Sequence, residues 1–389
     1  MQDFEFNTVK RIISGERAAL SLAQQCEHLG MFRPLLVTDP GLMAIGLVQP
    51  VIQALQKAGV AAALFDQVRE DPPESTVMEA VHIARAAEAD GVIAVGGGSS
   101  MDVAKVVAVL LRAEQQLSDI YGVGQVVGGR LPLILVPTTA GTGSEVTPVA
   151  VITTGETTKA GVSSPVLLPD VAVLDPSLTL GLPAAVTAMT GVDAMVHAIE
   201  AYTSVHKKNP LSDTLAVRAL QLLSSNLRAA VSNGDHYPVR ANMLLGACLA
   251  GQAFANAPVA AVHALAYPLG GHYHIPHGLS NSLVLPSVLE FNASAAAPLY
   301  AELAEVVIGE AVSGSDEAKT AALIDALRTL IDDVQLPATL AAAKVREEDL
   351  EMLADDAMQQ QRLLINNPRE VARQDALDIY RAAYGGAAA

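Results

Sequence analysis

The stretch that decides the fold of the first half of the chain is Gly91–Lys105, GVIAVGGGSSMDVAK. Its opening run, Gly91–Val95, is continuously apolar, which is typical of a strand buried on both faces of a parallel sheet. Three glycines and a helical segment follow, so the backbone can turn tightly and present helix N–H groups to a phosphate. The stretch matches neither GxGxxG nor a Walker A sequence. A plain strand-to-helix turn is therefore the alternative interpretation.

The same alternation of β-rich runs and helical segments extends on both sides of this stretch. Helices are predicted over about residues 41–58 and 75–88. The other predicted strands are Leu35–Asp39, Val60–Phe65, Leu131–Val136, Val149–Thr153 and Val171–Leu174. Strands that alternate with helices in this way predict a mostly parallel sheet covered by helices.

From about Pro183 the pattern changes, because apolar residues recur at helical spacing and Ala becomes very common. The predicted helices cover roughly 184–204, 211–232, 237–256, 295–306, 317–333 and 369–384, with loops around Pro210, Pro258 and Pro276. A chain of 389 residues suggests two domains. We expect an α/β dinucleotide-binding domain at 1–182 and an all-helical metal-binding and substrate domain at 183–389. The short Ala tail after Gly386 is predicted to fray.

Composition narrows the possible classes of partner and compartment. The net charge of −17 argues against nucleic acid or an anionic membrane as a partner. There is no run of 18 or more apolar residues, so no membrane span is expected. The acidic stretch Met1–Phe6 does not resemble a signal peptide. Cys26 and Cys248 form no CxxC motif or disulfide framework, which fits a reducing cytoplasm.

Two further features of the first half point to a bound ligand. The loop Pro137–Pro148 follows the next buried strand and combines hydroxyls with glycines, as would suit the wrapping of a polar ligand. Ligands bind outside the carboxyl ends of parallel strands, so two such loops in succession strengthen that interpretation. Asp39 ends the predicted strand Leu35–Asp39. There its carboxylate can accept hydrogen bonds from ribose hydroxyls and repel a 2′-phosphate. This predicts NAD over NADP, and a helix-capping Asp is the alternative.

The second half carries groups typical of metal ligands. Asp193 and His197 are four residues apart, so on a helix they share one face. His263 lies on another apolar stretch of helical character, and the break Pro268–Gly271 could turn the chain back toward the same point. Three histidines after that break are alternatives for the last ligand: His272, His274 and His277.

Each of these groups also has a simpler explanation, as a helix pair, a core histidine or a loop residue. Burying them without partners would be costly, so the combination favours a metal. Three imidazoles and a carboxylate suit Fe²⁺, Zn²⁺, Co²⁺ or Ni²⁺. A zinc with four protein ligands is typically closed and structural, whereas a metal with room for another ligand can bind a substrate oxygen. This favours Fe²⁺, or Zn²⁺ able to expand its shell.

Four motifs together resemble those of the iron-containing (group III) alcohol dehydrogenases. They are Gly96–Ser99 with Asp102 and Lys105, the loop Pro137–Pro148, the segment Gly191–Glu200, and the segment His263–Gly278. The resemblance covers almost the whole chain and includes Asn367-Pro368-Arg369 near its end. It implies an N-terminal dinucleotide-binding α/β domain followed by an all-α domain.

The resemblance also implies a role for individual residues. The implied metal ligands are Asp193, His197, His263 and His277. The implied cofactor residues are Gly97, Gly98 and Ser99 at the pyrophosphate with Asp102 nearby, Thr138, Thr139, Thr142, Thr147 and Lys159 at the nicotinamide and ribose, and Leu178 at the adenine. Asp39 matches members that prefer NAD, while Phe254 and Val149 fall where members line the substrate pocket.

One position departs from the family pattern. Many members carry a second histidine four residues after the third metal ligand, proposed to help move protons, and this chain has Tyr267 there. Tyr267, His274, water or the cofactor ribose are the alternatives for that role.

The resulting expectation is a metal-dependent enzyme that reversibly transfers a hydride between a small primary alcohol or diol and NAD, and that forms a homo-oligomer. A strongly anionic substrate would need an arginine, and the sequence does not indicate one near the motifs. The alternatives are an enzyme like glycerol dehydrogenase or maleylacetate reductase, a dehydroquinate-synthase-type lyase, or a metal-dependent binding protein. The lyase would need several basic residues, and the segments in question are poor in Lys and Arg.

Overall fold

The computed structural model describes residues 3–155 and 158–385. The chain divides into two compact units. An α/β unit spans Asn7–Leu180, and a helical unit contains the residues from Gly181 onward together with the described residues before Asn7. The Ala tail after Gly386, predicted to fray, lies outside the described residues.

The core of the α/β unit is a six-stranded sheet in which neighbouring strands run parallel, in the order β1-β9-β6-β4-β2-β3. The strands are β1 Arg11–Ser14, β2 Leu35–Val37, β3 Ala63–Phe65, β4 Val92–Gly96, β6 Leu133–Pro137 and β9 Val171–Leu174. The parallel sheet that the sequence predicts is therefore confirmed. The sequence pattern did not indicate β1, which pairs with β9 at one edge.

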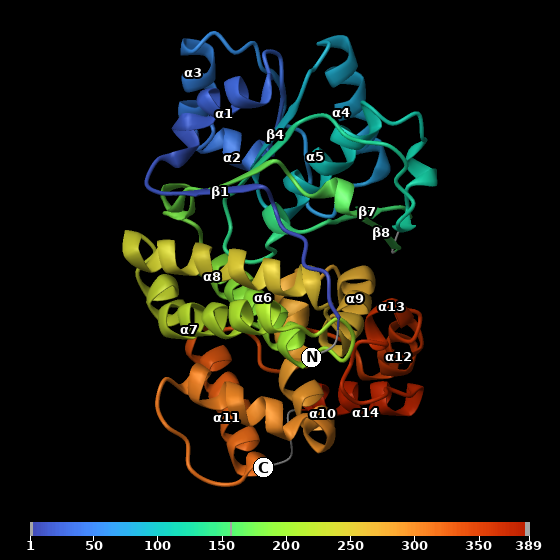
Figure 1. The fold of residues 1–389 in the computed structure, drawn as a ribbon. Coiled ribbons are helices and arrows are strands. Elements are labelled where there is room, and N and C mark those ends of the chain that lie inside the picture. The colour runs from blue at the N-terminus through green and yellow to red at the C-terminus, as the bar shows by residue number, and fades with distance from the viewer. Residues whose placement is uncertain (1–2, 156–157, 386–389) are drawn as a thin grey trace. The chain divides into compact units, whose positions relative to one another are not determined.

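Helices cover both faces of this sheet, as Figure 1 shows around β4. Alternate residues such as Ala94 pack in one apolar cluster with α4 (Glu74–Ala86) and α5 (Gly98–Leu110). The residues between them, such as Ile93 and Val95, pack in a second cluster with α1 (Leu22–Leu29) and α3 (Gln49–Lys57). Because a strand directs successive side chains to opposite faces, burial on both faces explains the unbroken apolar run.

Two predictions for this unit were wrong in detail. The single helix expected over 41–58 is two helices, α2 (Pro40–Ala44) and α3, because the chain turns at Gly46 with a positive φ of 72°. The predicted strand Val149–Thr153 exists as β7, but it lies outside the parallel sheet. It pairs antiparallel with β8 (Lys159–Ser163), the strand that follows it in the chain. A two-residue strand, β5 (Gly122–Val123), completes this second sheet.

In the described part of the chain, six short 3₁₀ helices connect the main elements: η1 Ala18–Ser21, η2 Leu117–Asp119, η3 Ser144–Val146, η4 Pro165–Leu167, η5 Pro176–Thr179 and η6 Glu347–Asp349. Of these, η3 is the one that matters for the candidate site, because it lies within the loop Pro137–Pro148. The left-handed conformation of Gly143, with φ of 60°, starts it.

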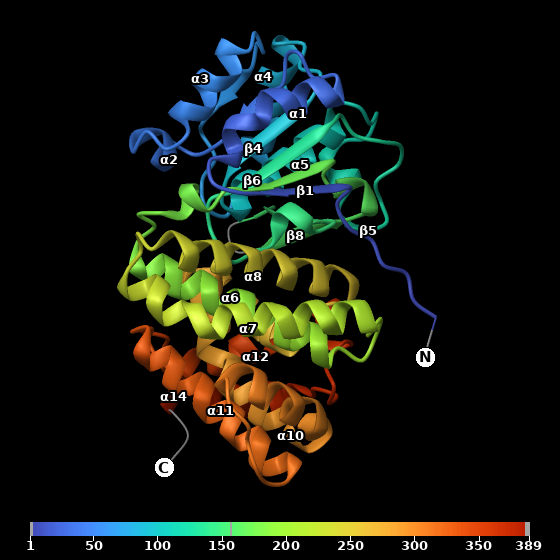
Figure 2. The same ribbon diagram turned by 60° about the vertical axis from the view of Figure 1, so that its left-hand side comes forward.

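The second unit contains helices and no strand among its described residues, as predicted. Its helices are α6 Ala184–Thr203, α7 Pro210–Ser232, α8 Tyr237–Asn256, α9 Ala261–Tyr273, α10 His277–Ile308, α11 Asp316–Asp333, α12 Leu350–Ala357, α13 Gln361–Leu364 and α14 Arg373–Gly385. Figure 2 shows α6, α7 and α8 side by side, and each contacts the other two. No single described helix is long and apolar enough for a membrane span; α8 and α9 meet that test only as a pair, bent by 107°.

The segment that brings His277 to the site differs from the prediction. The expected break at Pro268–Gly271 is absent, and these residues stay within α9. The chain turns instead at His274–Pro276, where a loop around Pro276 was also predicted, and His274 ends α9 with a left-handed φ of 53°. His277 then begins α10, which runs to Ile308 and is much longer than the predicted helix at 295–306. α10 contains two internal prolines, which would by themselves weaken a helix. Its packing against α6 and α11 stabilises it over its full length.

Candidate metal and dinucleotide sites

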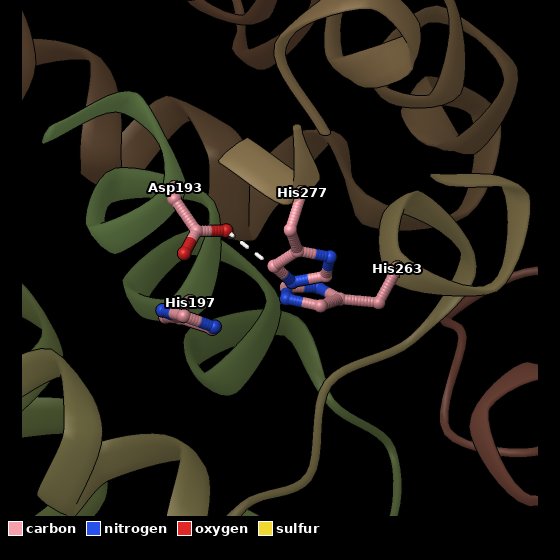
Figure 3. A group of neighbouring side chains, drawn as sticks. All are labelled: Asp193, His197, His263 and His277. Atoms are coloured by element: carbon pink, nitrogen blue, oxygen red, sulfur yellow. Dashed lines mark ion pairs between the residues drawn. The ribbon is translucent and has the colours of Figure 1, made fainter. Parts of the chain in front are cut away.

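One carboxylate and three imidazoles converge within the helical unit. Asp193, His197, His263 and His277, hereafter the ligand cluster, each offer one ligand atom, and these atoms lie within 4.8 Å of one another. Figure 3 shows the four side chains gathered around one point, with Asp193 and His197 on one helix and His263 and His277 on two other segments. One carboxylate and three imidazoles form a ligand set that transition metals prefer.

Three helices supply the ligand cluster. Asp193 and His197 lie one turn apart on α6, as their spacing predicts. His263 is in the first turn of α9, and His277 is the first residue of α10. Gly278 allows α10 to approach α6 closely, because a Cβ at this position would lie 2.3 Å from the carbonyl oxygen of Met189. The structure thus brings His277 into the cluster, while His272 pairs with Asp356 at 2.5 Å and His274 is exposed.

The ligand cluster is buried on all but one side. Asp193, His197 and His263 are 2–4% exposed, whereas the side chain of His277 is 37% exposed. The ring of His197 is stacked between Phe254 and His263, with centroid separations of 4.3 Å and 4.8 Å. Phe254, predicted to line the substrate pocket, is half-buried at that position. Any group that reaches the cluster from solvent therefore meets it beside His277.

The electrostatics of the ligand cluster favour an ionised carboxylate. Burial would raise the pKa of Asp193, but the three histidines and a hydrogen bond from Asn281 outweigh it and hold that pKa below its ordinary value. The Oδ1 atom of Asp193 lies 3.7 Å from Nε2 of His277. An anionic oxygen and three imidazole nitrogens facing one point form a donor set that fits a divalent cation.

A second buried carboxylate orients His263. The Oε2 atom of Glu200 lies 2.6 Å from Nδ1 of His263, and its Oε1 atom accepts a hydrogen bond of 2.7 Å from the backbone N–H of Val262. A carboxylate beside Nδ1 places the imidazole proton on that nitrogen, so the lone pair of Nε2 faces the cluster. Sequence reasoning missed this role, although Glu200 lies seven residues after Asp193 and therefore on the same helix face.

Asn281 is the other residue that sequence reasoning missed. It is fully buried one turn after His277 on α10, and its Nδ2 donates a 2.6 Å hydrogen bond to Oδ1 of Asp193. The same nitrogen lies 3.3 Å from Nε2 of His263 and 3.4 Å from Nε2 of His277. The i,i+4 spacing from His277 is the signal that could have identified it.

Tyr267 lies at the open side of the ligand cluster. Its ring is 5.8 Å from the ring of His277, and the residue is half-buried. The guanidinium carbon of Arg362 lies 5.9 Å from the centroid of the Tyr267 ring. Arg362, on α13, is exposed and is the one arginine among the described residues of the helical unit whose guanidinium makes no hydrogen bond or ion pair. Sequence reasoning found no arginine near the motifs and so did not point to Arg362.

The glycine-rich turn lies at the carboxyl end of β4 and opens α5. Gly97 is the residue before the helix, and Gly98 and Ser99 form its first turn, so their N–H groups are available to a phosphate. A Cβ on Gly98 would approach the methyl carbon of Thr142 to 2.9 Å. The turn and the loop Pro137–Pro148 therefore touch each other, which only a residue without a side chain permits.

The hydroxyl residues of that loop lie beside the glycine turn. The backbone N–H of Thr138 donates to the carbonyl of Gly96 at 3.0 Å, because β4 and β6 are neighbours in the sheet. Thr139 and Thr142 are half-buried and face Gly97 and Gly98, respectively. These contacts form a small polar surface at the carboxyl end of the sheet, where α/β proteins bind ligands.

Asp39 occupies the end of β2, the next strand of the same sheet. Its Oδ1 atom accepts a 2.9 Å hydrogen bond from the N–H of Leu42 and so caps α2. A Cβ on Gly96 would lie 3.8 Å from its Oδ2 atom, which places this carboxylate next to the glycine turn. Asp39 therefore caps α2 and also lies beside the predicted cofactor loop, so the two interpretations are compatible.

The remaining residues that the resemblance associated with the cofactor have internal partners. Both carboxylate oxygens of Asp102 accept hydrogen bonds from the protein, from Ser144 Oγ at 2.7 Å and from the N–H of Val151 at 2.9 Å. Lys159 forms an ion pair of 2.6 Å with Asp71. Leu178 is buried in the apolar cluster that contains α1 and α3. Thr147, the last of these cofactor residues, is buried. Val149, which the resemblance associated with the substrate pocket, is half-buried at the start of β7.

Comparison with known families matches both units. The model described as "Iron-containing alcohol dehydrogenase" matches residues 9–176. The model described as "Fe-containing alcohol dehydrogenase family, C-terminal" matches residues 187–384. Together they cover nearly the whole chain.

Individual relatives are similar over their full length. Long-chain-alcohol dehydrogenase 1 of Geobacillus thermodenitrificans is 42% identical over 368 residues, which is 94% of this chain and 93% of the relative. Sulfoacetaldehyde reductase of Bilophila wadsworthia is 37% identical, over 97% of this chain and 98% of the relative. The crystal structure of a 1,3-propanediol oxidoreductase superposes with a TM-score of 0.95 at 36% identity, covering 98% of this chain and 100% of that one.

Proposed function

The chain belongs to the iron-containing alcohol dehydrogenases and is an NAD-dependent alcohol dehydrogenase, and we propose that its reaction requires a divalent metal held by the ligand cluster. The observation that carries this proposal is the convergence of one carboxylate oxygen and three imidazole nitrogens within 4.8 Å in a largely buried site. In the reaction, the alcohol loses a hydride from carbon to the nicotinamide and a proton from oxygen, giving a carbonyl compound, NADH and H⁺. The reverse reaction reduces the carbonyl compound.

A bound divalent metal would supply Lewis-acid polarisation of the alcohol or carbonyl oxygen. The protein contributes the orientation of the donors. Glu200 fixes the tautomer of His263, and Asn281 holds the carboxylate of Asp193 through its 2.6 Å hydrogen bond. Phe254 covers His197 and keeps water from that side of the cluster. We propose Fe²⁺ as the native metal, with Zn²⁺ as the main alternative.

We assign the proton-handling role to Tyr267. Its ring lies 5.8 Å from the ring of His277, the most exposed member of the ligand cluster, and the residue is itself half-buried. His274 is exposed at the turn between α9 and α10, and among the described residues its side chain makes no hydrogen bond, ion pair or ring contact with a cluster residue. Of the side chains considered for this role, Tyr267 is therefore the better placed.

We propose that the dinucleotide binds at the carboxyl end of the parallel sheet. Its pyrophosphate would take the N–H groups of Gly98 and Ser99 at the start of α5, and Thr138, Thr139 and Thr142 would contact the nicotinamide half. Asp39 beside Gly96 would accept bonds from a ribose and repel a 2′-phosphate, which favours NAD over NADP.

We propose a small primary alcohol or diol, or the corresponding aldehyde, as the substrate. Phe254, half-buried and stacked on the ring of His197, is the apolar residue beside the ligand cluster that supports this class. Relatives named for long-chain alcohols and for 1,3-propanediol are consistent with a neutral alcohol.

A second candidate is a short aldehyde or alcohol that carries an anionic group. Arg362 favours it, because an unpaired guanidinium next to Tyr267 offers a positive charge at the open side of the ligand cluster. A relative is named sulfoacetaldehyde reductase, which acts on such a compound. Replacing Arg362 by Gln would raise KM about tenfold for an anionic substrate and leave KM for a neutral diol unchanged. Equal KM changes for both substrates would exclude the anionic class.

The proposal is tested by metal analysis joined to an activity assay. The protein is purified without oxygen, its Fe, Zn and Ni content is measured, and NADH absorbance is followed with short alcohols, diols and aldehydes. The variant His263→Ala should lose both bound metal and turnover. Metal content that survives this substitution would refute the ligand assignment, and inactivity of the iron-loaded wild type would refute the proposed reaction.

We also propose a homo-oligomer in a reducing, cytoplasmic compartment. The edge strand β1 has no partner on its outer side among the described residues, and exposed edges pair readily with other strands. Both cysteines are free and buried, which suits a compartment without disulfide formation. Sedimentation analysis of the purified protein would test the assembly.

A further inference from the structure

A fully buried lysine on α5 links this helix to the end of the loop Pro137–Pro148 and to the start of β7. Lys105 lies two turns into α5, and its side chain is 0% exposed. Its ammonium donates hydrogen bonds to Ser144 Oγ at 2.8 Å, to Thr147 Oγ1 at 3.2 Å and to the carbonyl of Val149 at 2.7 Å. An ammonium has three N–H donors, so all of them are used on one short segment of chain.

Buried acidic groups accompany this ammonium. Asp102, one turn earlier on α5, lies 3.8 Å from Nζ of Lys105 and accepts a hydrogen bond from Ser144 Oγ. Its second oxygen accepts the N–H of Val151 on β7. Glu145 is also buried, and its charge together with that of Asp102 acts on Lys105. Charged side chains of α5 thus hold this helix to the segment from Ser144 to Val151 through directional hydrogen bonds.

An apolar side chain would fill this space at a lower desolvation cost. Taking an ammonium out of water costs several kcal/mol even after relaxation, and buried ion pairs often give no net gain in stability. Burial lowers the pKa of Lys105 to about 8, against the opposing charges of Asp102 and Glu145, which reflects that cost. Directional hydrogen bonds, in contrast with apolar contacts, fix where Thr147 and the Val149 carbonyl lie.

We propose that Lys105 is a positioning residue for the cofactor, and that it holds the segment Thr147–Val149 in place to receive the nicotinamide half of NAD. This inference rests on the proposed function, because the dinucleotide is assigned to the same loops. Lys105 itself does not touch the cofactor, since its three N–H donors are taken by the protein. Removing Lys105 should therefore weaken the binding of the nicotinamide half selectively and leave the pyrophosphate site at Gly98 and Ser99 intact.

The test compares two ligands on the variant Lys105→Met. Full-length protein is titrated with NADH by fluorescence and with ADP, which has the adenine end and the pyrophosphate but lacks the nicotinamide half. We expect NADH to bind about tenfold more weakly and ADP to bind within twofold of the wild type. Metal content should be unchanged, because the ligand cluster lies in the other unit. In turnover, KM for NAD should rise while KM for the alcohol stays constant.

A matched control is Arg240→Met, because Arg240 is also a buried cation with three protein acceptors but lies in the helical unit. It should leave NADH affinity unchanged. Ser144→Ala removes one acceptor of Lys105, and it should weaken NADH about threefold even if Lys105→Met does not fold. Unchanged NADH affinity in the folded variants, or an equal loss of NADH and ADP, would overturn the inference. Failure of the wild type to bind either ligand would instead overturn the proposed cofactor site.

Discussion

Replacing Glu200 by Gln should weaken metal binding without unfolding the protein. The carboxylate accepts two hydrogen bonds, from Nδ1–H of His263 at 2.6 Å and from the N–H of Val262 at 2.7 Å. Glutamine keeps the shape but has a single acceptor oxygen, so its NH₂ group must face one of these donors. If that donor is His263, the imidazole proton moves to Nε2, the atom that faces the cluster, and blocks the metal.

The size of the effect follows from these contacts. Loss of a hydrogen bond to a metal-ligating histidine typically lowers metal affinity by about 10–100-fold. This corresponds to about 1.4–2.7 kcal/mol of binding free energy. Both side chains are at most 5% exposed, so solvent cannot substitute for the lost acceptor and the effect should lie in the upper part of that range.

The assay is competition for Zn²⁺ or Fe²⁺ with a chelator of known affinity at fixed pH. The control is Asp175→Asn, because Asp175 is also a buried carboxylate that accepts backbone N–H groups, but it lies in the α/β unit. That variant should lose stability and keep its metal affinity. A folded Glu200→Gln protein with metal affinity within twofold of the wild type would refute the role assigned to Glu200.

Three other substitutions test the structure elsewhere. Asp39→Gly should raise the NADP-to-NAD ratio of kcat/KM at least tenfold, and an unchanged ratio would remove Asp39 from cofactor selection. Burial raises the pKa of Glu145 from 4.5 to about 7, so its contribution to stability is complete below pH 4.5 and is lost as the pH rises toward 7. Relative to Glu145→Gln, wild-type stability in urea should fall by roughly 1.4 kcal/mol per pH unit across that window, and parallel curves would contradict this. Gly278→Ala should cost about 1–3 kcal/mol in the free energy of unfolding, because its Cβ would lie 2.3 Å from the Met189 carbonyl, and wild-type stability would show that α10 can shift.

Much of the fold was predictable because its signals are local. The apolar run at Gly91–Val95, followed by glycines, predicts a buried strand and a helix start, and the structure confirms β4 and α5. Helical spacing from about Pro183 onward predicts the all-α unit, and α6, α7 and α8 begin and end within a few residues of the expected positions. Such patterns reflect burial of one face, which each segment encodes by itself.

The candidate site was predictable in part. Spacing alone placed Asp193 and His197 on one face of α6, but it left three histidines as candidates for the last ligand. The family resemblance selected His277, and the structure places that residue in the ligand cluster. Glu200 and Asn281 also lie at helical spacing from ligands, yet nothing local distinguishes them from ordinary polar residues of a helix.

The sequence by itself determined the two kinds of unit, the glycine turn and the pair of ligands on α6, because each depends on neighbours within a few residues. Only the tertiary structure decided which atoms meet. The turn at His274–Pro276 sets where His277 points. The close contact at Gly278 sets how near α10 comes to α6. Contacts between distant segments depend on packing geometry, and no local pattern of residues records that geometry.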